Sequence, residues 1–150
     1  MSSAVFASLL YGLEHCALGA RDQRRLDGYF LRLAKRVLHL RYDYHLAYTE
    51  AEQRLGIERP SQRLARERLR WTGHALRSED TALREVLTFT PEGGARRRGR
   101  PRLRFYDTLK MDLAERDITL PARNQAEFWE LLCEKTADRI SWQKTVNWRR

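Results

Sequence analysis

The chain has 150 residues, which is enough for one domain or for slightly less than two small ones, and 42% of them are hydrophobic, enough to form a buried core. Its net charge is +9, which favours a polyanionic partner. Its two cysteines are too few for a disulfide framework or a cysteine-based zinc site, and no apolar run is long enough to span a membrane, so we expect an intracellular protein with no bound metal or cofactor.

The first half of the chain predicts two helices. Residues 4–12 are apolar and fit either a buried strand or the start of a helix. Residues 22–40 predict a helix, because apolar residues recur at steps of three and four and form one face, namely Leu26, Tyr29, Phe30, Leu33, Val37 and Leu40. The basic residues Arg25, Arg32, Lys35 and Arg36 lie off that face and could follow a phosphate backbone or simply be solvated. A short helix is predicted to begin at Thr49, with Glu52 completing a capping box, and to end at Gly56.

The second half predicts further helices around a loop. One runs from Pro60 to about Arg77, and another from a cap at Asp80 to Leu87. After the loop of residues 88–101, a helix follows around residues 103–113, with Asp107 and Asp112 on its polar side. Asn124 and Glu127 form a second capping box at the start of the last long helix, whose pattern continues through residues 137–142 towards Val146.

These elements predict an all-α fold, a small bundle of about five or six helices in two subunits that are joined at a basic loop. We expect a helical region over residues 1–90, the loop over residues 91–102 and a C-terminal helical segment over residues 103–150.

The loop ends in the most basic stretch of the chain. Residues 96–104 hold six arginines and no acid, namely Arg96, Arg97, Arg98, Arg100, Arg102 and Arg104. Guanidinium groups pair with phosphate oxygens, often through two bonds. The Arg98–Arg102 core also resembles an AT-hook, which lies in the minor groove of A·T-rich DNA. A nuclear-localisation signal and a solvated basic linker are the alternatives.

Charge and arginine usage both favour nucleic acid over a membrane surface. Residues 1–95 carry 15 Lys or Arg against 12 Asp or Glu, and residues 105–150 carry eight of each sign, so the excess sits mostly in residues 96–104. Arginine outnumbers lysine by 25 to 4, and its planar fork suits phosphates and stacks on bases.

Four segments together resemble one family. They are Leu9-Leu10-Tyr11-Gly12, then Arg68-Leu69-Arg70-Trp71-Thr72-Gly73-His74-Ala75-Leu76-Arg77, then Gly99-Arg100-Pro101-Arg102-Leu103-Arg104-Phe105 with Asp107, and finally Ala137-Asp138-Arg139 with Trp142. Their order and spacing resemble the region that follows the polymerase core in the reverse transcriptases of non-LTR (LINE-type) retrotransposons. The resemblance covers nearly the whole chain, and its Arg-Trp-x-Gly-His-x-x-Arg and Gly-Arg-Pro segments carry most of the specificity.

The resemblance implies a thumb-like helical region that grips a template–product duplex or the element's RNA. It implies nucleic-acid contacts for Arg68, Arg70, His74 and Arg77, besides the arginines of the loop, and packing roles for Trp71, Gly73 and Tyr106. It also implies that the rest of the reverse transcriptase is a partner and that the protein works in the nucleus, or in nucleus and cytoplasm.

The chain departs from the family where polymerisation would need its acids. The Tyr-x-Asp-Asp motif is absent, and Arg41-Tyr42-Asp43-Tyr44 has a single Asp, whereas the reaction needs a carboxylate cluster that holds two Mg²⁺ ions. We therefore expect a nucleic-acid-binding fragment that is not an enzyme as this chain. The alternatives are a stand-alone AT-hook-like DNA-binding protein and a helical interaction module with a basic localisation signal.

Overall fold

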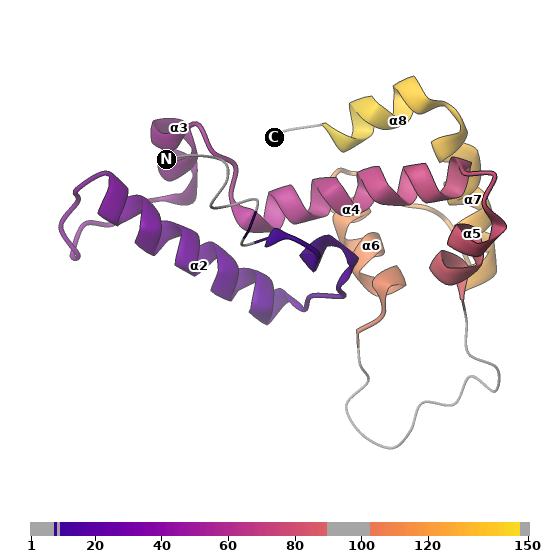
Figure 1. The fold of residues 1–150 in the computed structure, drawn as a ribbon, viewed down its shortest axis with the longest axis horizontal. Coiled ribbons are helices and arrows are strands. Elements are labelled where there is room, and N and C mark those ends of the chain that lie inside the picture. Colours follow the sequence, from indigo (N-terminus) through magenta and orange to yellow (C-terminus); the bar gives the residue numbers. More distant parts are fainter. Residues whose placement is uncertain (1–7, 9, 90–102, 148–150) are drawn as a thin grey trace, which may run out of the picture. The chain divides into compact units, whose positions relative to one another are not determined.

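The protein is all-helical in a computed structural model that describes residue 8, residues 10–89 and residues 103–147 (Figure 1). Seven α-helices and one 3-10 turn, η1 (Leu13–His15), make up the regular structure of this part of the chain, and it holds no strand. The predicted all-α class is confirmed, with one or two helices more than expected. None of the described helices combines the length and the apolar character needed to cross a membrane.

The chain divides into two compact units. Unit 1 comprises residues 1–65 and unit 2 residues 66–150, so that the division falls inside helix α4 (Pro60–Arg77). Each unit has its own core. Unit 1 is built on the buried residues Phe30, Ala34, Leu46 and Ala51. Unit 2 has a larger core of leucines and aromatic rings, which includes Leu69, Leu109, Phe128, Leu132 and Trp142.

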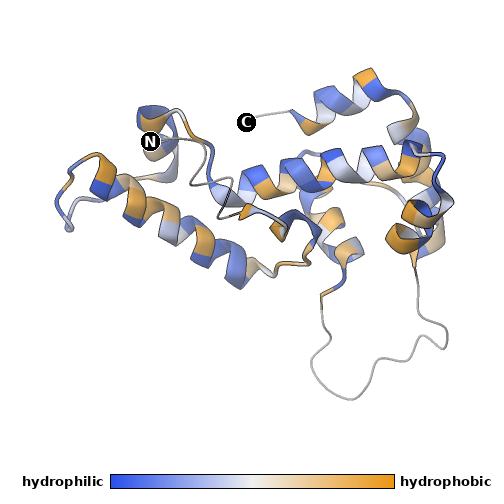
Figure 2. Cartoon of the chain, in the orientation of Figure 1, coloured by the Kyte–Doolittle hydropathy of each residue, from blue (hydrophilic) through white to orange (hydrophobic). Residues whose placement is uncertain are grey.

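Helix α2 (Ala20–Val37) supplies most of the core of unit 1. Hydrophobic residues recur along it between hydrophilic ones (Figure 2). The buried side is narrower than the predicted stripe, because Phe30 and Ala34 are buried whereas Tyr29 and Val37 are exposed. Asp27 lies on the buried side as well, where its carboxylate accepts hydrogen bonds from the backbone N–H of Ser61 at 3.0 Å and from its Oγ at 2.7 Å. Asp27 thus satisfies donors in the first turn of α4, which explains a carboxylate on this face.

Helix α3 (Tyr48–Leu55) begins differently from the prediction. Its N-cap is Ala47, with no side-chain hydrogen bond, so the predicted capping box of Thr49 and Glu52 is wrong. Glu52 instead accepts a hydrogen bond from the backbone N–H of Arg59 at 3.0 Å, in the connection to α4. Glu52, which the local pattern assigned to the cap, therefore makes its hydrogen bond outside the helix instead. The predicted end is confirmed, because Gly56 closes α3 with a left-handed backbone, φ 64°.

Four further helices complete unit 2: α5 (Thr81–Thr88), α6 (Phe105–Ala114), α7 (Gln125–Ala137) and α8 (Arg139–Val146). Two predicted caps are confirmed, since Asp80 accepts from the backbone N–H of Ala82 and Asn124 from that of Glu127, both at 2.9 Å. Glu127 accepts a hydrogen bond from the backbone N–H of Arg123, one residue before the cap, so the predicted capping box of Asn124 and Glu127 is only half formed.

The last helix is broken where the sequence pattern predicted continuity. Asp138 has an extended backbone between α7 and α8, and its side chain accepts from the backbone N–H of Ile140 at 2.9 Å. Apolar spacing alone does not show this break, because Phe128, Leu132, Trp142 and Val146 are all buried and α8 continues to supply the core. The break allows α8 to run in a different direction from α7.

Candidate nucleic-acid interface

Helix α4 presents a stripe of basic side chains within unit 2. Arg66, Arg70, His74 and Arg77 follow one another at steps of four, four and three residues, which places them on one face of the helix. Leu69, Thr72 and Leu76 lie on the buried side. Because one face of α4 is buried in the core of unit 2, the helical periodicity places these basic residues together on the opposite, outer face.

Close packing of α8 on α4 forms a groove beside this stripe. The indole Nε1 of Trp142 donates a hydrogen bond to the backbone carbonyl of Leu69 at 3.0 Å, and Trp142 is fully buried. Gly73 makes the approach possible, because a Cβ at this position would overlap the Trp142 ring. The packing role that the resemblance implies for Gly73 is confirmed.

The groove is a hollow of about 720 Å³ with a strongly basic lining. Four of its residues belong to α4 and the rest to α8 or the residue that follows it, and none is acidic: Arg66, Arg70, His74, Arg77, Arg139, Trp142, Gln143, Val146 and Asn147. Besides the arginines, Gln143 and Asn147 bring amide groups that can donate hydrogen bonds to phosphate oxygens.

The positive charges of Arg77 and Arg139 repel each other in the groove. The pKa of Arg77 is lowered from its ordinary value, mainly by burial and then by the positive charge of Arg139. Arg77 donates to the backbone carbonyl of Thr136 at 2.9 Å, which fixes its side chain at the end of the groove. No carboxylate of the described part of the chain lies within 4.0 Å of either guanidinium. An anion bound between them would relieve this repulsion.

The contacts that Glu67 makes with two arginines of the stripe are long. Glu67 lies 3.7 Å from Arg66 and 3.9 Å from Arg70, with the Arg70 side chain 77% exposed. Direct charge-assisted hydrogen bonds measure about 2.7–2.9 Å, so Glu67 leaves room for a phosphate to compete. Exposed pairs of this kind contribute only about 0–1 kcal/mol, so replacing the Glu67 contact by a phosphate contact would lose little free energy.

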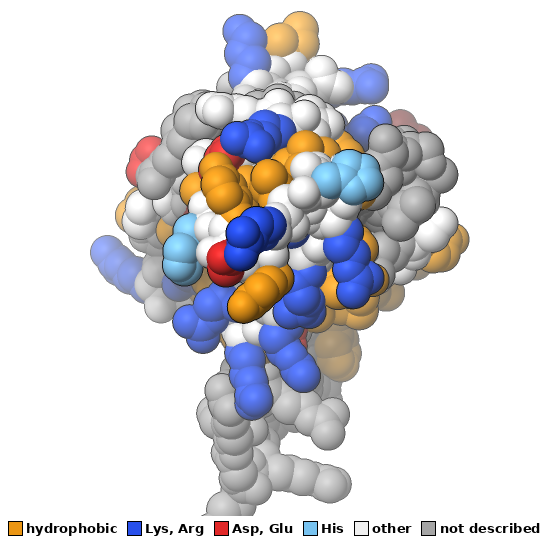
Figure 3. All heavy atoms as spheres, turned by 90° about the vertical axis from the view of Figure 1, so that its left-hand side faces the viewer, with side chains coloured by type: hydrophobic (Ala, Val, Ile, Leu, Met, Phe, Trp, Pro, Cys, Tyr) orange, Lys and Arg blue, Asp and Glu red, His pale blue; other side chains and the backbone are white. Residues whose placement is uncertain are grey.

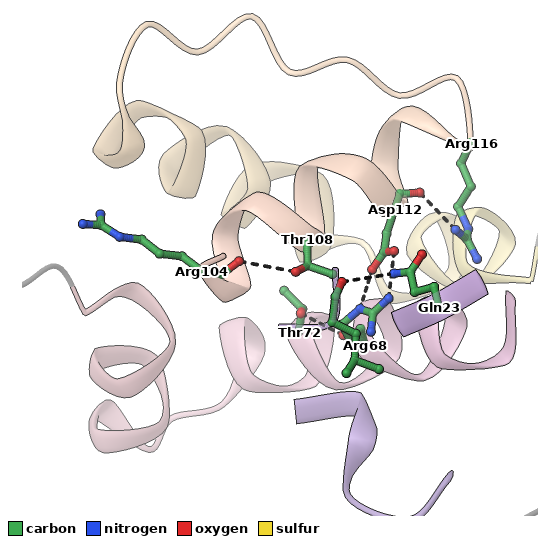
Figure 4. Close-up of polar contacts among 8 residues, drawn as sticks. Gln23, Arg68, Thr72, Arg104, Thr108, Asp112 and Arg116 are labelled. Atoms are coloured by element: carbon green, nitrogen blue, oxygen red, sulfur yellow. Dashed lines mark hydrogen bonds and ion pairs between the residues drawn. The ribbon is translucent and has the colours of Figure 1, made fainter. Parts of the chain in front are cut away.

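Arg68 corrects the set of contacts that the resemblance implies. Its side chain is fully buried and forms a two-bond ion pair with Asp112 of α6, Nε to Oδ2 at 2.6 Å and Nη2 to Oδ1 at 3.0 Å (Figure 4). In this structure Arg68 therefore cannot reach a ligand on the surface. Asp112 was expected on the polar side of its helix, and it too is buried, because it neutralises Arg68.

The other predicted contact residues fall into two groups. Arg70, His74 and Arg77 line the groove together. Arg104 is half-buried just before α6, where its backbone N–H donates to Asp107 at 3.0 Å. Its carbonyl accepts from the Thr108 hydroxyl at 3.4 Å (Figure 4). The remaining arginines of the loop, Arg96, Arg97, Arg98, Arg100 and Arg102, lie outside the described residues.

Sequence reasoning missed Arg66 and Arg139 as members of the site. The helical spacing of residues 66, 70, 74 and 77 carried the signal for Arg66. No such signal existed for Arg139, because its place in the groove depends on the contact between Trp142 and α4, across 73 residues of chain.

Across the described ranges, no group of three His, Cys, Asp or Glu side chains is arranged to hold a metal ion. Comparisons of the chain with models of protein families, with curated proteins and with solved structures found no match.

Proposed function

We propose that this chain is a non-catalytic nucleic-acid-binding module that grips a sugar–phosphate backbone through arginine–phosphate contacts. The observation that carries the proposal is the groove of unit 2, which arginines of α4 and α8 line together with His74 and without any acidic residue. A surface of one sign of charge, concave and arginine-rich, is how a polyanion-binding site is recognised.

The length of the basic stripe favours a polymer over a single phosphate. Arg66 and Arg77 are eleven residues apart on α4, which corresponds to about 16 Å along the helix axis. One strand of a duplex carries a phosphate about every 3.4 Å of its axis, so a stripe of this length passes several phosphates. A mononucleotide would leave most of these cations without a counter-charge.

The resemblance to the reverse transcriptases of non-LTR retrotransposons supports the same function and suggests its setting. In this setting the chain is a fragment of the region after the polymerase core, the ligand is a template–product duplex or the element's RNA, and the rest of the reverse transcriptase is a partner in the nucleus. The arginines of the basic loop, Arg98, Arg100 and Arg102 among them, add to the grip on the ligand.

The test compares a double substitution in the groove with a single substitution outside it, by fluorescence anisotropy with a labelled DNA duplex at low salt. Changing Arg77→Gln and Arg139→Gln together should lower the affinity about tenfold or more, because two charge-assisted contacts are lost. Changing Arg123→Gln, an exposed arginine of unit 2 outside the groove, should leave the affinity within about twofold.

Equal affinity of the groove variant and the Arg123 control would contradict the groove as the binding site. A third variant, with Arg98, Arg100 and Arg102 all changed to Gln, measures the share of the basic loop separately. Loss of binding in that variant alone would assign the function to the loop and remove it from the groove.

A further inference from the structure

Unit 1 displays a tyrosine ring on the turn between α2 and α3. Tyr42 is 90% exposed, and its side chain forms no hydrogen bond or ring contact with any described residue. Tyr29 of the same unit is only 42% exposed, and the Arg32 guanidinium lies 5.7 Å from its ring centroid. Both faces of the Tyr42 ring are thus open to a stacking ligand.

The backbone beneath this ring is held on both sides. The Lys35 ammonium donates to the carbonyl of Tyr42 at 3.1 Å, and the Tyr44 N–H donates to the carbonyl of Arg41 at 3.1 Å. The Tyr44 hydroxyl donates to Glu50 of α3 at 3.0 Å. At its two ends the turn is anchored by Leu40 and Leu46, which pack into the core of unit 1. The turn is thus pre-organised, so binding through Tyr42 would cost little conformational entropy.

Basic side chains flank the turn. Arg36 at the end of α2 and Arg41 in the turn are exposed. Two acids lie nearby: Asp43 is 3.3 Å from Arg41, with both side chains more than half exposed, and Glu50 is held by the Tyr44 hydroxyl and by Arg54. The end of unit 1 that carries this turn shows several Lys and Arg side chains interspersed with hydrophobic ones, and fewer acidic ones (Figure 3). This combination of an exposed ring and flanking guanidiniums suits a base together with its neighbouring phosphates.

We infer that unit 1 carries a second nucleic-acid site, specific for single strands, in which Tyr42 stacks on an unpaired base while Arg36 and Arg41 hold the flanking phosphates. The inference takes its class of ligand from the proposed function, but it does not depend on the groove of unit 2. Bases in a duplex are already stacked on each other, so a single ring on a turn can reach only an unpaired base. A protein partner would also accept an exposed tyrosine, but the surrounding charge favours a polyanion.

The experiment measures the affinity of the full chain for an oligothymidine and for a duplex, and maps cross-links to an oligonucleotide that carries 5-iodouracil. Changing Tyr42→Ala should lower the single-strand affinity about tenfold and leave the duplex affinity unchanged. Tyr11→Ala is the matched control, because Tyr11 is 88% exposed and also belongs to unit 1. It should leave both affinities unchanged, and the cross-linked peptide should contain Tyr42.

Unchanged single-strand affinity in the Tyr42 variant, or cross-links that avoid Tyr42, would overturn the inference and assign the ring to a partner other than nucleic acid. The proposed function would still stand if the Arg77 and Arg139 variant loses duplex affinity. In the converse case, loss of single-strand affinity only through Tyr42, with an unaffected groove variant, would retain the inference and remove the groove.

Discussion

Trp142 packs directly against Gly73, and this contact joins α8 to α4 along the groove. A substitution of Gly73→Ala would make a methyl group overlap the indole edge that holds Nε1 and Cδ1 of Trp142. Alanine favours a helix over glycine by about 1 kcal/mol, but forcing extra volume into a packed core costs about 1–3 kcal/mol, and the Trp142 ring is fully buried and hydrogen-bonded to the Leu69 carbonyl. We expect a net loss in the free energy of unfolding, measured by urea denaturation.

Gly28 offers the matched control for this prediction. It lies inside α2, and a Cβ added there meets no atom within 4 Å. Changing Gly28→Ala should therefore stabilise the protein by about 0.5–1 kcal/mol. Equal effects of the two substitutions would show that Gly73 is not required for close packing.

The buried pair of Arg68 and Asp112 should show strong coupling. Changing Asp112→Asn removes the negative charge and leaves the Arg68 guanidinium buried without its counter-charge, which costs about 3–5 kcal/mol. Changing both residues together, Arg68→Met and Asp112→Leu, should recover much of that loss, since buried pairs are often replaceable by apolar residues. A double-mutant cycle on unfolding free energies, built from Arg68→Met, Asp112→Leu and the double variant, measures the coupling, and additive effects would contradict the pairing.

The caps of α7 and α3 differ in a way that stability measurements can detect. Asn124 accepts from the backbone N–H of Glu127, so Asn124→Ala should destabilise the protein by about 1 kcal/mol. Thr49 does not cap α3, and its substitution by alanine should change the free energy of unfolding by less than about 0.5 kcal/mol. A larger loss at Thr49 than at Asn124 would restore the predicted capping box.

The two cysteines should react with iodoacetamide at different rates. Burial raises the pKa of the Cys133 thiol, with a smaller opposing effect from Arg84 and a further increase from Glu130, so less of it is thiolate at a given pH. Cys16 is exposed. Labelling followed by mass spectrometry at mildly alkaline pH should modify Cys16 first, and Cys133 should catch up as the pH rises. Faster modification of Cys133 would contradict its position in unit 2.

Local signals predicted much of the fold. Helix α4 begins at Pro60 and ends at Arg77, as expected. Asp80 and Asn124 cap the starts of α5 and α7, and Gly56 closes α3, where the sequence predicted them. Each of these depends on residues a few positions apart, which a sequence displays directly. The Asp138 break was also a local cap, but the apolar pattern that runs across it concealed it.

The site was harder to predict, because its residues are sorted by contacts between distant segments. Arg68 and Arg70 look alike in the sequence, yet Arg68 is buried against an acid 44 positions further along the chain, and Arg70 is exposed in the groove. Helical spacing separates the faces of α4, but only the position of α6 and α8 decides which face is covered. The role of Arg139 could be found only once Trp142 was seen to pack on α4.

A salt titration of the unaltered chain with a short DNA duplex tests the central claim most directly. If arginine–phosphate contacts hold the ligand, the logarithm of the affinity should fall linearly with the logarithm of the salt concentration, with a slope of about −0.9 for each phosphate neutralised. An affinity that does not change with salt, or no binding even in dilute buffer, would contradict the proposal.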